Sequence, residues 1–175
     1  LSRREIAQRL DDRFRLLTGG SRTAPPRQQT LAAALDWSYR LLADDERKVL
    51  LRLSVFSGGC TLAAAESVCA DDADGANNTL GAGAVLDVLL HLVDKSLVVA
   101  EQKEDGTRYR LMETIRQYAG EKLIQFGEAQ RIRERHCAFF VAWAEGAQAQ
   151  IDGPDQVVWL RRYEAEHDNV RSALE

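Results

Sequence analysis

The sequence has few cysteines and prolines and no excess of positive charge. Its 175 residues include three cysteines and three prolines, with a formal net charge of −4. Three cysteines without Cys-x-x-Cys or Cys/His spacing neither form a disulfide framework nor suggest a metal site. A net negative chain has no general attraction for nucleic acid or an anionic membrane. Composition therefore favours a reduced globular protein whose partners must be inferred from local surfaces.

Long apolar runs and targeting signals are also missing. No run approaches the roughly 18–20 apolar residues that span a bilayer, and the opening LSRREIAQRLDD lacks the apolar segment of a signal peptide. We therefore expect a cytoplasmic protein with no membrane partner. Gly81 and Gly83 are not followed by Lys-Ser/Thr, so they do not form a phosphate loop. No enzyme constellation is present, and the absence of an initial Met suggests a piece of a longer protein.

A helix followed by a hairpin is the most informative pattern. Residues 84–95, AVLDVLLHLVDK, have helical periodicity, and the strand-like runs SLVVAEQ and TRYRLM follow. Asp105-Gly106 lies between these runs and is a strong hairpin signal. A helix followed by a two-stranded wing predicts the end of a winged-helix domain.

The predicted surface of that helix is unsuited to DNA. Its polar residues fall on one face and comprise two carboxylates, an imidazole and a single lysine: Asp87, His91, Asp94 and Lys95. A winged helix that reads DNA needs Arg, Lys, Asn or Gln at these positions. The fold thus indicates a DNA reader, whereas the surface would repel phosphate.

Helical patterns occupy most of the remaining chain. We expect helices over residues 1–17, from Thr30 to Leu42, over 44–56 and 62–70, and a polar, Gly-rich loop over 71–83. Trp37 and Leu41 are expected to widen the apolar face of the helix that Thr30 caps. Pro25-Pro26 favours an extended linker over residues 21–29.

Three more helices follow the wing and predict an antiparallel arm. Apolar stripes are expected on each of them: Ile115, Ala119, Leu123 and Phe126; Ile132, His136, Phe139, Phe140, Trp143 and Ala147; Leu160, Tyr163, His167, Val170 and Leu174. Their width predicts the start of a helical repeat. Arg131, Arg133 and Arg135 are expected on a solvated face, and Glu164, Glu166 and Asp168 are expected to form surface pairs of little energetic value.

Several segments together resemble a known family. TLAAALDWSYRLLADDERKVLLRLSVFSGGCTLAAAESVC, LVDKSLVV, YRLMETIRQYAGEKL and EAEHDNVRSALE are similar, in order, to large bacterial transcriptional regulators of the LuxR/AfsR type. These carry a STAND ATPase module akin to the NB-ARC ATPases. The resemblance implies four parts: 1–20, the end of the ATPase helical domain; 21–29, a linker; 30–112, the winged helix; and 113–175, a helical arm entering tetratricopeptide-like repeats.

The same resemblance implies a nucleotide switch. In such proteins the winged helix does not read DNA but folds over the nucleotide pocket as a lid on the ADP-bound, inactive state. The implied cofactors are ADP and ATP with Mg²⁺, held outside this chain, so the chain itself is no enzyme. The implied partners are the preceding ATPase domain, an effector bound through the repeats, and further copies of the protein after ATP exchange. DNA would be contacted only by a separate domain.

Three residues are candidates for positions near the nucleotide. The NB-ARC relatives carry Met-His-Asp at the end of the wing, where this chain has Leu111-Met112-Glu113. Met112 replaces the phosphate-contacting His and cannot donate a hydrogen bond, and Glu113 has a simpler explanation in the first turn of its helix. Arg27 on the linker, or Arg22 before it, is the alternative phosphate contact.

Two other functions compete with the lid. The wing offers Lys103, Arg108 and Arg110 for DNA, although Glu101, Glu104 and Asp105 offset their charge. A module that binds proteins through the helical hairpins is the remaining hypothesis.

Overall fold

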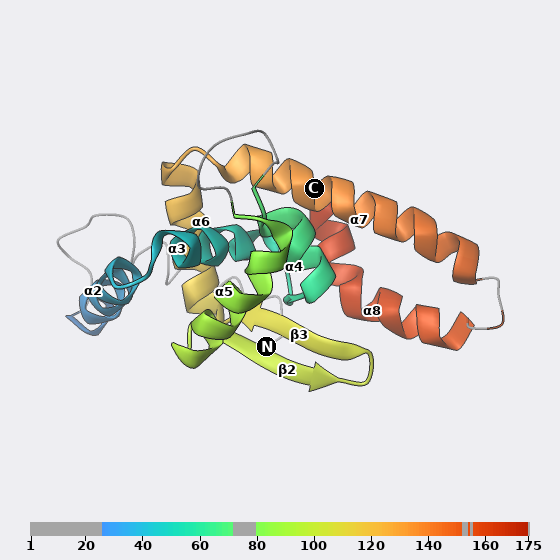
Figure 1. Cartoon of the computed structure of the whole chain (residues 1–175), viewed down its shortest axis with the longest axis horizontal. Helices are drawn as coiled ribbons and strands as arrows, with labels where there is room; N and C mark the ends of the chain where they lie inside the picture. The colour runs from blue at the N-terminus through green and yellow to red at the C-terminus, as the bar shows by residue number, and fades with distance from the viewer. Residues whose placement is uncertain (1–25, 72–79, 152–153, 155, 175) are drawn as a thin grey trace.

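The computed structural model describes residues 26–71, 80–151, 154 and 156–174. The predicted helix over 1–17, Arg22 and most of the predicted loop lie outside these residues. The elements run in chain order (Figure 1) as α2 (Pro26–Arg40), α3 (Asp44–Arg52), the short 3₁₀ helix η1 (Leu53–Val55), β1 (Cys60–Thr61), α4 (Leu62–Cys69), α5 (Ala82–Asp94), β2 (Val98–Lys103), β3 (Gly106–Leu111), α6 (Glu113–Gln125), α7 (Ala129–Ile151) and α8 (Gln156–Ala173).

The described chain is mainly helical and contains a winged helix, as predicted. Helices α3, α4 and α5 pack around one apolar core, and the β2–β3 hairpin follows α5 directly. The strands pair antiparallel, with Ala100 opposite Tyr109 and Val98 opposite Leu111. Helices α4 and α5 therefore form the helix-turn-helix, with α5 at the recognition-helix position and the hairpin as the wing.

The sheet has a third strand that the sequence did not predict. The two residues of β1 pair antiparallel with β3, giving the strand order β1-β3-β2. Gly59 makes this pairing sterically possible. Its φ is +89°, and a Cβ there would lie 2.6 Å from the Tyr109 carbonyl oxygen. The turn Ser57–Gly59 therefore passes directly against β3, closer than any side chain would permit.

The boundaries of three helices differ from the sequence prediction. Helix α2 begins at Pro26 instead of Thr30, so residues 26–29 of the predicted linker are helical; proline is favoured in a first helical turn, where no backbone donor is needed. Helix α5 begins at Ala82, inside the predicted loop. Helix α3 ends at Arg52 and tightens into η1. Thr61 caps α4 as predicted, accepting the Ala64 amide at 3.3 Å.

Several side chains predicted as core are exposed. Trp37 and Phe126 are 66% and 63% exposed, and Leu41 lies outside the core as well. On α8 the predicted apolar stripe is displaced, because Leu160, His167 and Leu174 are exposed while Glu166 and Asn169 are buried. The stripe is correct in part, because Val170 packs against the core and Tyr163 stacks on Trp143, but the fully buried positions of α8 are polar.

Helices α6, α7 and α8 form an arm that packs on the winged helix. Helix α6 lies against α3 and η1, while α7 and α8 form an antiparallel hairpin that leaves the winged helix on the opposite side from α2 (Figure 1). Among the described helices, none has both the length and the apolar character needed to cross a membrane.

Candidate interaction surface of the winged helix

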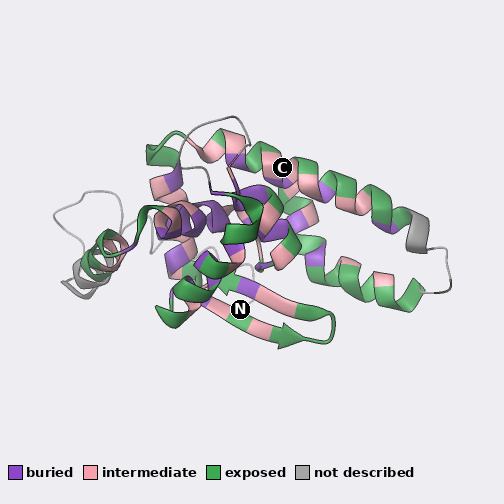
Figure 2. Cartoon of the chain, in the orientation of Figure 1, coloured by how far each residue is buried: buried purple, intermediate pink, exposed green. Residues whose placement is uncertain are grey.

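Helix α5 divides into a buried apolar face and an exposed acidic face. Val85, Leu89 and Leu92 are fully buried in the core. On the outside lie Asp87, His91 and Asp94, together with Leu90, which is 47% exposed. Exposed residues along α5 and the hairpin are visible in Figure 2. The predicted polar face of this helix is confirmed, and it presents carboxylates where a DNA reader needs donors.

The one lysine at the end of α5 is held by a carboxylate of α3. Lys95 Nζ lies 2.6 Å from both carboxylate oxygens of Glu46, which is only 6% exposed. Burial raises the pKa of Glu46, but the hydrogen bonds from Lys95 and the Ala43 amide outweigh it and lower the pKa. Glu46 is therefore a charged partner at neutral pH, and Lys95 is not available to phosphate without breaking this pair.

The cations of the wing are likewise paired with carboxylates. On β2, Glu101 accepts a hydrogen bond from Arg110 Nε at 2.6 Å and lies 3.2 Å from Lys103 Nζ. Arg108 forms a two-pronged pair with Glu166 of α8, at 2.6 and 3.1 Å. The predicted cancellation of charge on the wing thus occurs through direct contacts, one of them with the arm.

The tip of the wing also faces α8. Arg161 lies 3.3 Å from Glu104, and Arg162 lies 3.9 Å from Asp105 while its guanidinium stacks over the Trp159 ring. The Arg161 and Glu104 side chains are 66% and 88% exposed, so this pair contributes little stability. These contacts nevertheless place the arm beside the hairpin that a DNA-reading winged helix would direct at a groove.

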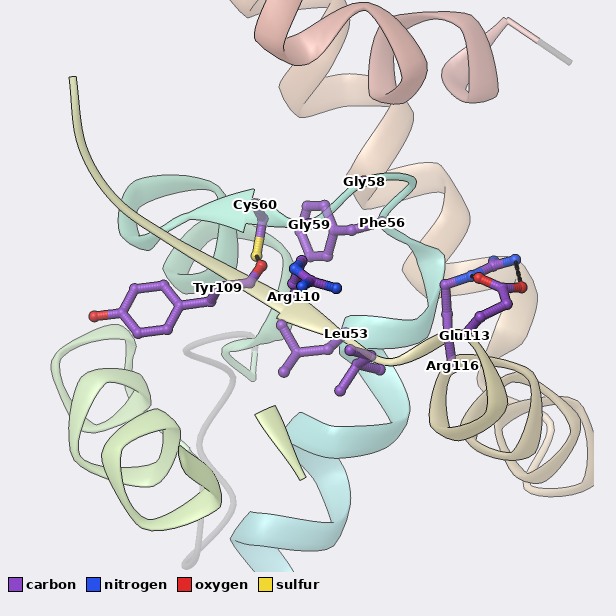
Figure 3. A pocket seen from close by; sticks show the side chains of 10 residues that line it. Leu53, Phe56, Gly58, Gly59, Cys60, Tyr109, Arg110, Glu113 and Arg116 are labelled. Carbon is purple, nitrogen blue, oxygen red and sulfur yellow. Dashed lines mark hydrogen bonds and ion pairs between the residues drawn. The ribbon is translucent and has the colours of Figure 1, made fainter. Parts of the chain in front are cut away.

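A small pocket lies where the wing joins the arm (Figure 3). Its volume is about 200 Å³, and Gly59, Arg110, Glu113 and Arg116 are among its lining residues. Glu113 opens α6, as predicted, and pairs with Arg116 at 2.7 and 3.0 Å. Met112 is adjacent to Glu113 and 46% exposed.

The three residues predicted near a nucleotide do not form one described site. Met112 offers no donor, and the Glu113 carboxylate would repel a phosphate, so these two side chains do not fit a direct phosphate contact. Arg27 is helical, within α2, and its side chain lies outside what the structure describes. Their closeness to a nucleotide in a longer protein stays a prediction. No group of three metal-ligating side chains occurs within the described residues.

Sequence reasoning missed a buried polar cluster at the base of the arm. Arg52 is 2% exposed and lies 2.7 Å from Asp71 and 3.0 Å from Glu128. It also donates to the Cys69 carbonyl at 2.7 Å. The signal was an arginine inside the apolar run VLLRLSVF, because a charge buried in such a run must find partners.

The second missed feature is the pairing of Glu166. We expected this residue to meet the arginines of α7 at the surface, yet it lies buried against Arg108. The signal in the sequence was the polar run Glu166 to Asn169 within a helix otherwise assigned an apolar stripe. That run shows where polar groups lie along α8 but does not indicate that they face inward.

Comparison with known proteins agrees with this geometry. Residues 42–124 match the family model described as "Winged helix-turn-helix domain". Fold and family model together define this region as a winged helix-turn-helix domain. No solved structure matches the chain.

The relatives are much longer than this chain. A Mycobacterium tuberculosis protein named as an HTH-type transcriptional regulator, Rv0890c, is 46% identical over 170 residues. The match covers 97% of this chain and 18% of that protein, and Mycobacterium bovis has a relative of equal similarity. An uncharacterized M. tuberculosis protein, Rv0894, is 44% identical over 137 residues, covering 78% of this chain and 33% of its own length. The chain thus spans less than a fifth of the length of the two 46% identical relatives.

Proposed function

We propose that this chain is a regulatory, non-catalytic part of a longer, nucleotide-switched transcriptional regulator. In this proposal the winged helix is a lid on the ADP-bound state of an ATPase domain of the same protein. The observation that carries it is the outward face of α5, where Asp87, Asp94 and the exposed Leu90 stand at recognition-helix positions. A duplex would meet repulsion there.

Such a face suits a protein partner. An exposed leucine flanked by carboxylates complements a surface that offers apolar area and scattered cations, and such contacts can form and release without unfolding either partner. The paired cations of the wing, Lys103, Arg108 and Arg110, add no positive field that would draw in DNA instead. A domain of the same protein is the partner that best fits a lid.

The arm would connect this lid to a sensor. Helices α7 and α8 have the antiparallel form of a helical repeat, and we propose that further repeats bind an effector. ADP and ATP with Mg²⁺ would be held by residues outside this chain. Replacement of ADP by ATP would shift the lid from one position to another and permit self-assembly. A separate domain would contact DNA.

A second candidate function is DNA binding by this winged helix itself. It is favoured by the description of the matching family and by the name of the mycobacterial regulator. It requires the wing or α5 to supply phosphate contacts, which their paired charges oppose.

Hydrogen exchange on the longer protein tests the lid. We expect the amides of α5 to exchange more slowly in the ADP-bound protein than in the ATP-bound protein. The double variant Asp87→Lys/Asp94→Lys should lose this protection, whereas Glu145→Lys on the exposed side of α7 should keep it. A longer protein that binds no nucleotide, or α5 exchange that is indifferent to ADP, would overturn the proposal.

A further inference from the structure

One polar network joins the wing to the arm. Arg108 of β3 pairs with Glu166 of α8, and its Nε and Nη2 atoms donate to the carbonyls of Gly58 and Gly59, each at 3.0 Å. Asn169 of α8 donates to the Gly59 carbonyl at 2.9 Å and to Glu166 at 2.7 Å. Three segments distant in sequence, the turn before β1, the strand β3 and helix α8, therefore meet at one point.

The network is buried and its members satisfy one another. Glu166 is 5% exposed and Asn169 is fully buried, while the Arg108 side chain is 12% exposed. Asn169 Oδ1 accepts the Ser57 amide at 2.8 Å. Each side chain thus bonds partners on both sides of the junction. A buried network of this kind contributes geometric specificity more than net stability, because desolvation offsets much of the attraction.

Two further ion pairs between the wing and α8 are weak by comparison. They are Arg161–Glu104 and Arg162–Asp105, and their side chains are exposed. Apolar surfaces can shift past each other in small steps because their contacts have no fixed direction. A two-pronged arginine–carboxylate pair forms in only one relative position of β3 and α8. A shift of α8 by a few ångströms would take the Glu166 carboxylate away from Arg108. It would also separate Asn169 from the Gly59 carbonyl and the Ser57 amide, and such losses at buried polar groups are costly. The junction is therefore either engaged or released, with no stable position between.

We propose that Arg108, Glu166 and Asn169 form a latch through which the arm controls the position and rigidity of the wing. A displacement of α7 and α8, whatever produces it, must release β3 and the Ser57–Gly59 turn together. The inference goes beyond the lid proposal and does not depend on it, because it concerns a contact within this chain. It applies equally if the wing meets a protein domain or a duplex.

Hydrogen exchange of this chain tests the latch. In Glu166→Gln and in Asn169→Ala we expect the amides of β3 to exchange about tenfold faster or more, while those of α3 change little. Glu164→Gln, an exposed substitution on the same helix, is the matched control and should leave β3 unchanged. Folded latch variants with unaltered β3 exchange, or with equal acceleration throughout the winged helix, would overturn the proposal.

A measurement on the unmodified chain keeps the test decisive if a variant does not fold. The exchange of β3 and of α8 is followed at increasing, sub-denaturing urea concentrations. A latch predicts that both elements open with a common free energy and a common urea dependence. Separate opening of β3, with α8 still protected, would contradict it.

Discussion

The exposed face of α5 and the buried junction with the arm carry opposite charge chemistry. Asp87 and Asp94 point to solvent from the recognition helix, whereas Arg52 and Arg108 are turned inward to carboxylates of the arm or its approach. A winged helix that reads DNA needs the reverse placement. The difference teaches that the fold alone does not assign the partner of a recognition helix, since the position of its cations decides what its surface attracts.

The largest expected effect comes from removing an inward cation. Arg52→Ala leaves Asp71 and Glu128 facing each other in a mostly buried setting, and we expect about 3–5 kcal/mol loss in the free energy of unfolding. Arg161→Ala, which breaks an exposed pair, should cost about 0–1 kcal/mol. Urea denaturation measures both. Equal losses of unfolding free energy in the two variants would contradict the view that inward charges stabilise the fold more than exposed ones.

Close packing at the Ser57–Gly59 turn gives the next largest expected loss of stability. Gly59→Ala places a Cβ 2.6 Å from the Tyr109 carbonyl at a φ of +89°, so we expect a loss of about 2–4 kcal/mol. Gly58→Ala shares the positive φ of +77°, but its nearest atom would lie 3.8 Å away, and about 1–2 kcal/mol is expected. Thermal unfolding compares the two, and a Gly59→Ala protein as stable as Gly58→Ala would contradict the close approach.

Acid should weaken the Arg52 cluster. Burial raises the pKa of Asp71, but the hydrogen bond from the Leu80 amide and the pair with Arg52 outweigh it and lower the pKa to about 2 from 3.8. A lowered pKa stabilises the folded state above pH 3.8, and this contribution of about 2 kcal/mol disappears as the pH falls towards 2. Unfolding free energies of wild type and Asp71→Asn should therefore converge across that range. A constant difference would show that Asp71 does not titrate as described.

The smallest effect concerns the outward face. Asp87→Lys/Asp94→Lys exchanges two carboxylates for cations at recognition-helix positions and should create weak, non-specific duplex binding. The log–log slope of its affinity against salt should be about −2, roughly one for each new phosphate contact, whereas wild type should show no binding to compare. The control Glu145→Lys/Glu134→Lys makes the same charge change on α7 and should bind the duplex more weakly. Equal binding by the two variants would mean that net charge, not the α5 face, controls affinity.

The sequence predicted what periodicity and turn chemistry control. The α5 helix, its acidic face and the Thr61 cap depend on neighbouring residues and were confirmed. The hairpin was confirmed too, although its two connecting residues are Glu104-Asp105 and Gly106 is the first residue of β3. The two-residue strand β1 was missed because its partner β3 lies far away in sequence, and because the pairing needs the close approach of Gly59 to β3. The predicted stripe of α8 was wrong in part, because Glu166 and Asn169 face inward to contact Arg108 and the Gly59 carbonyl. A polar contact between residues that are distant in sequence produces no periodic pattern along the chain.

We propose that this winged helix does not present a DNA-binding surface. Fluorescence anisotropy of the unmodified chain with a labelled, mixed-sequence duplex, at low and at moderate salt, tests it most directly. We expect no binding at low salt, since the α5 face would repel phosphate and the cations of the wing are held by carboxylates. Micromolar binding that falls steeply with salt would contradict the account and establish the wing or α5 as a DNA surface.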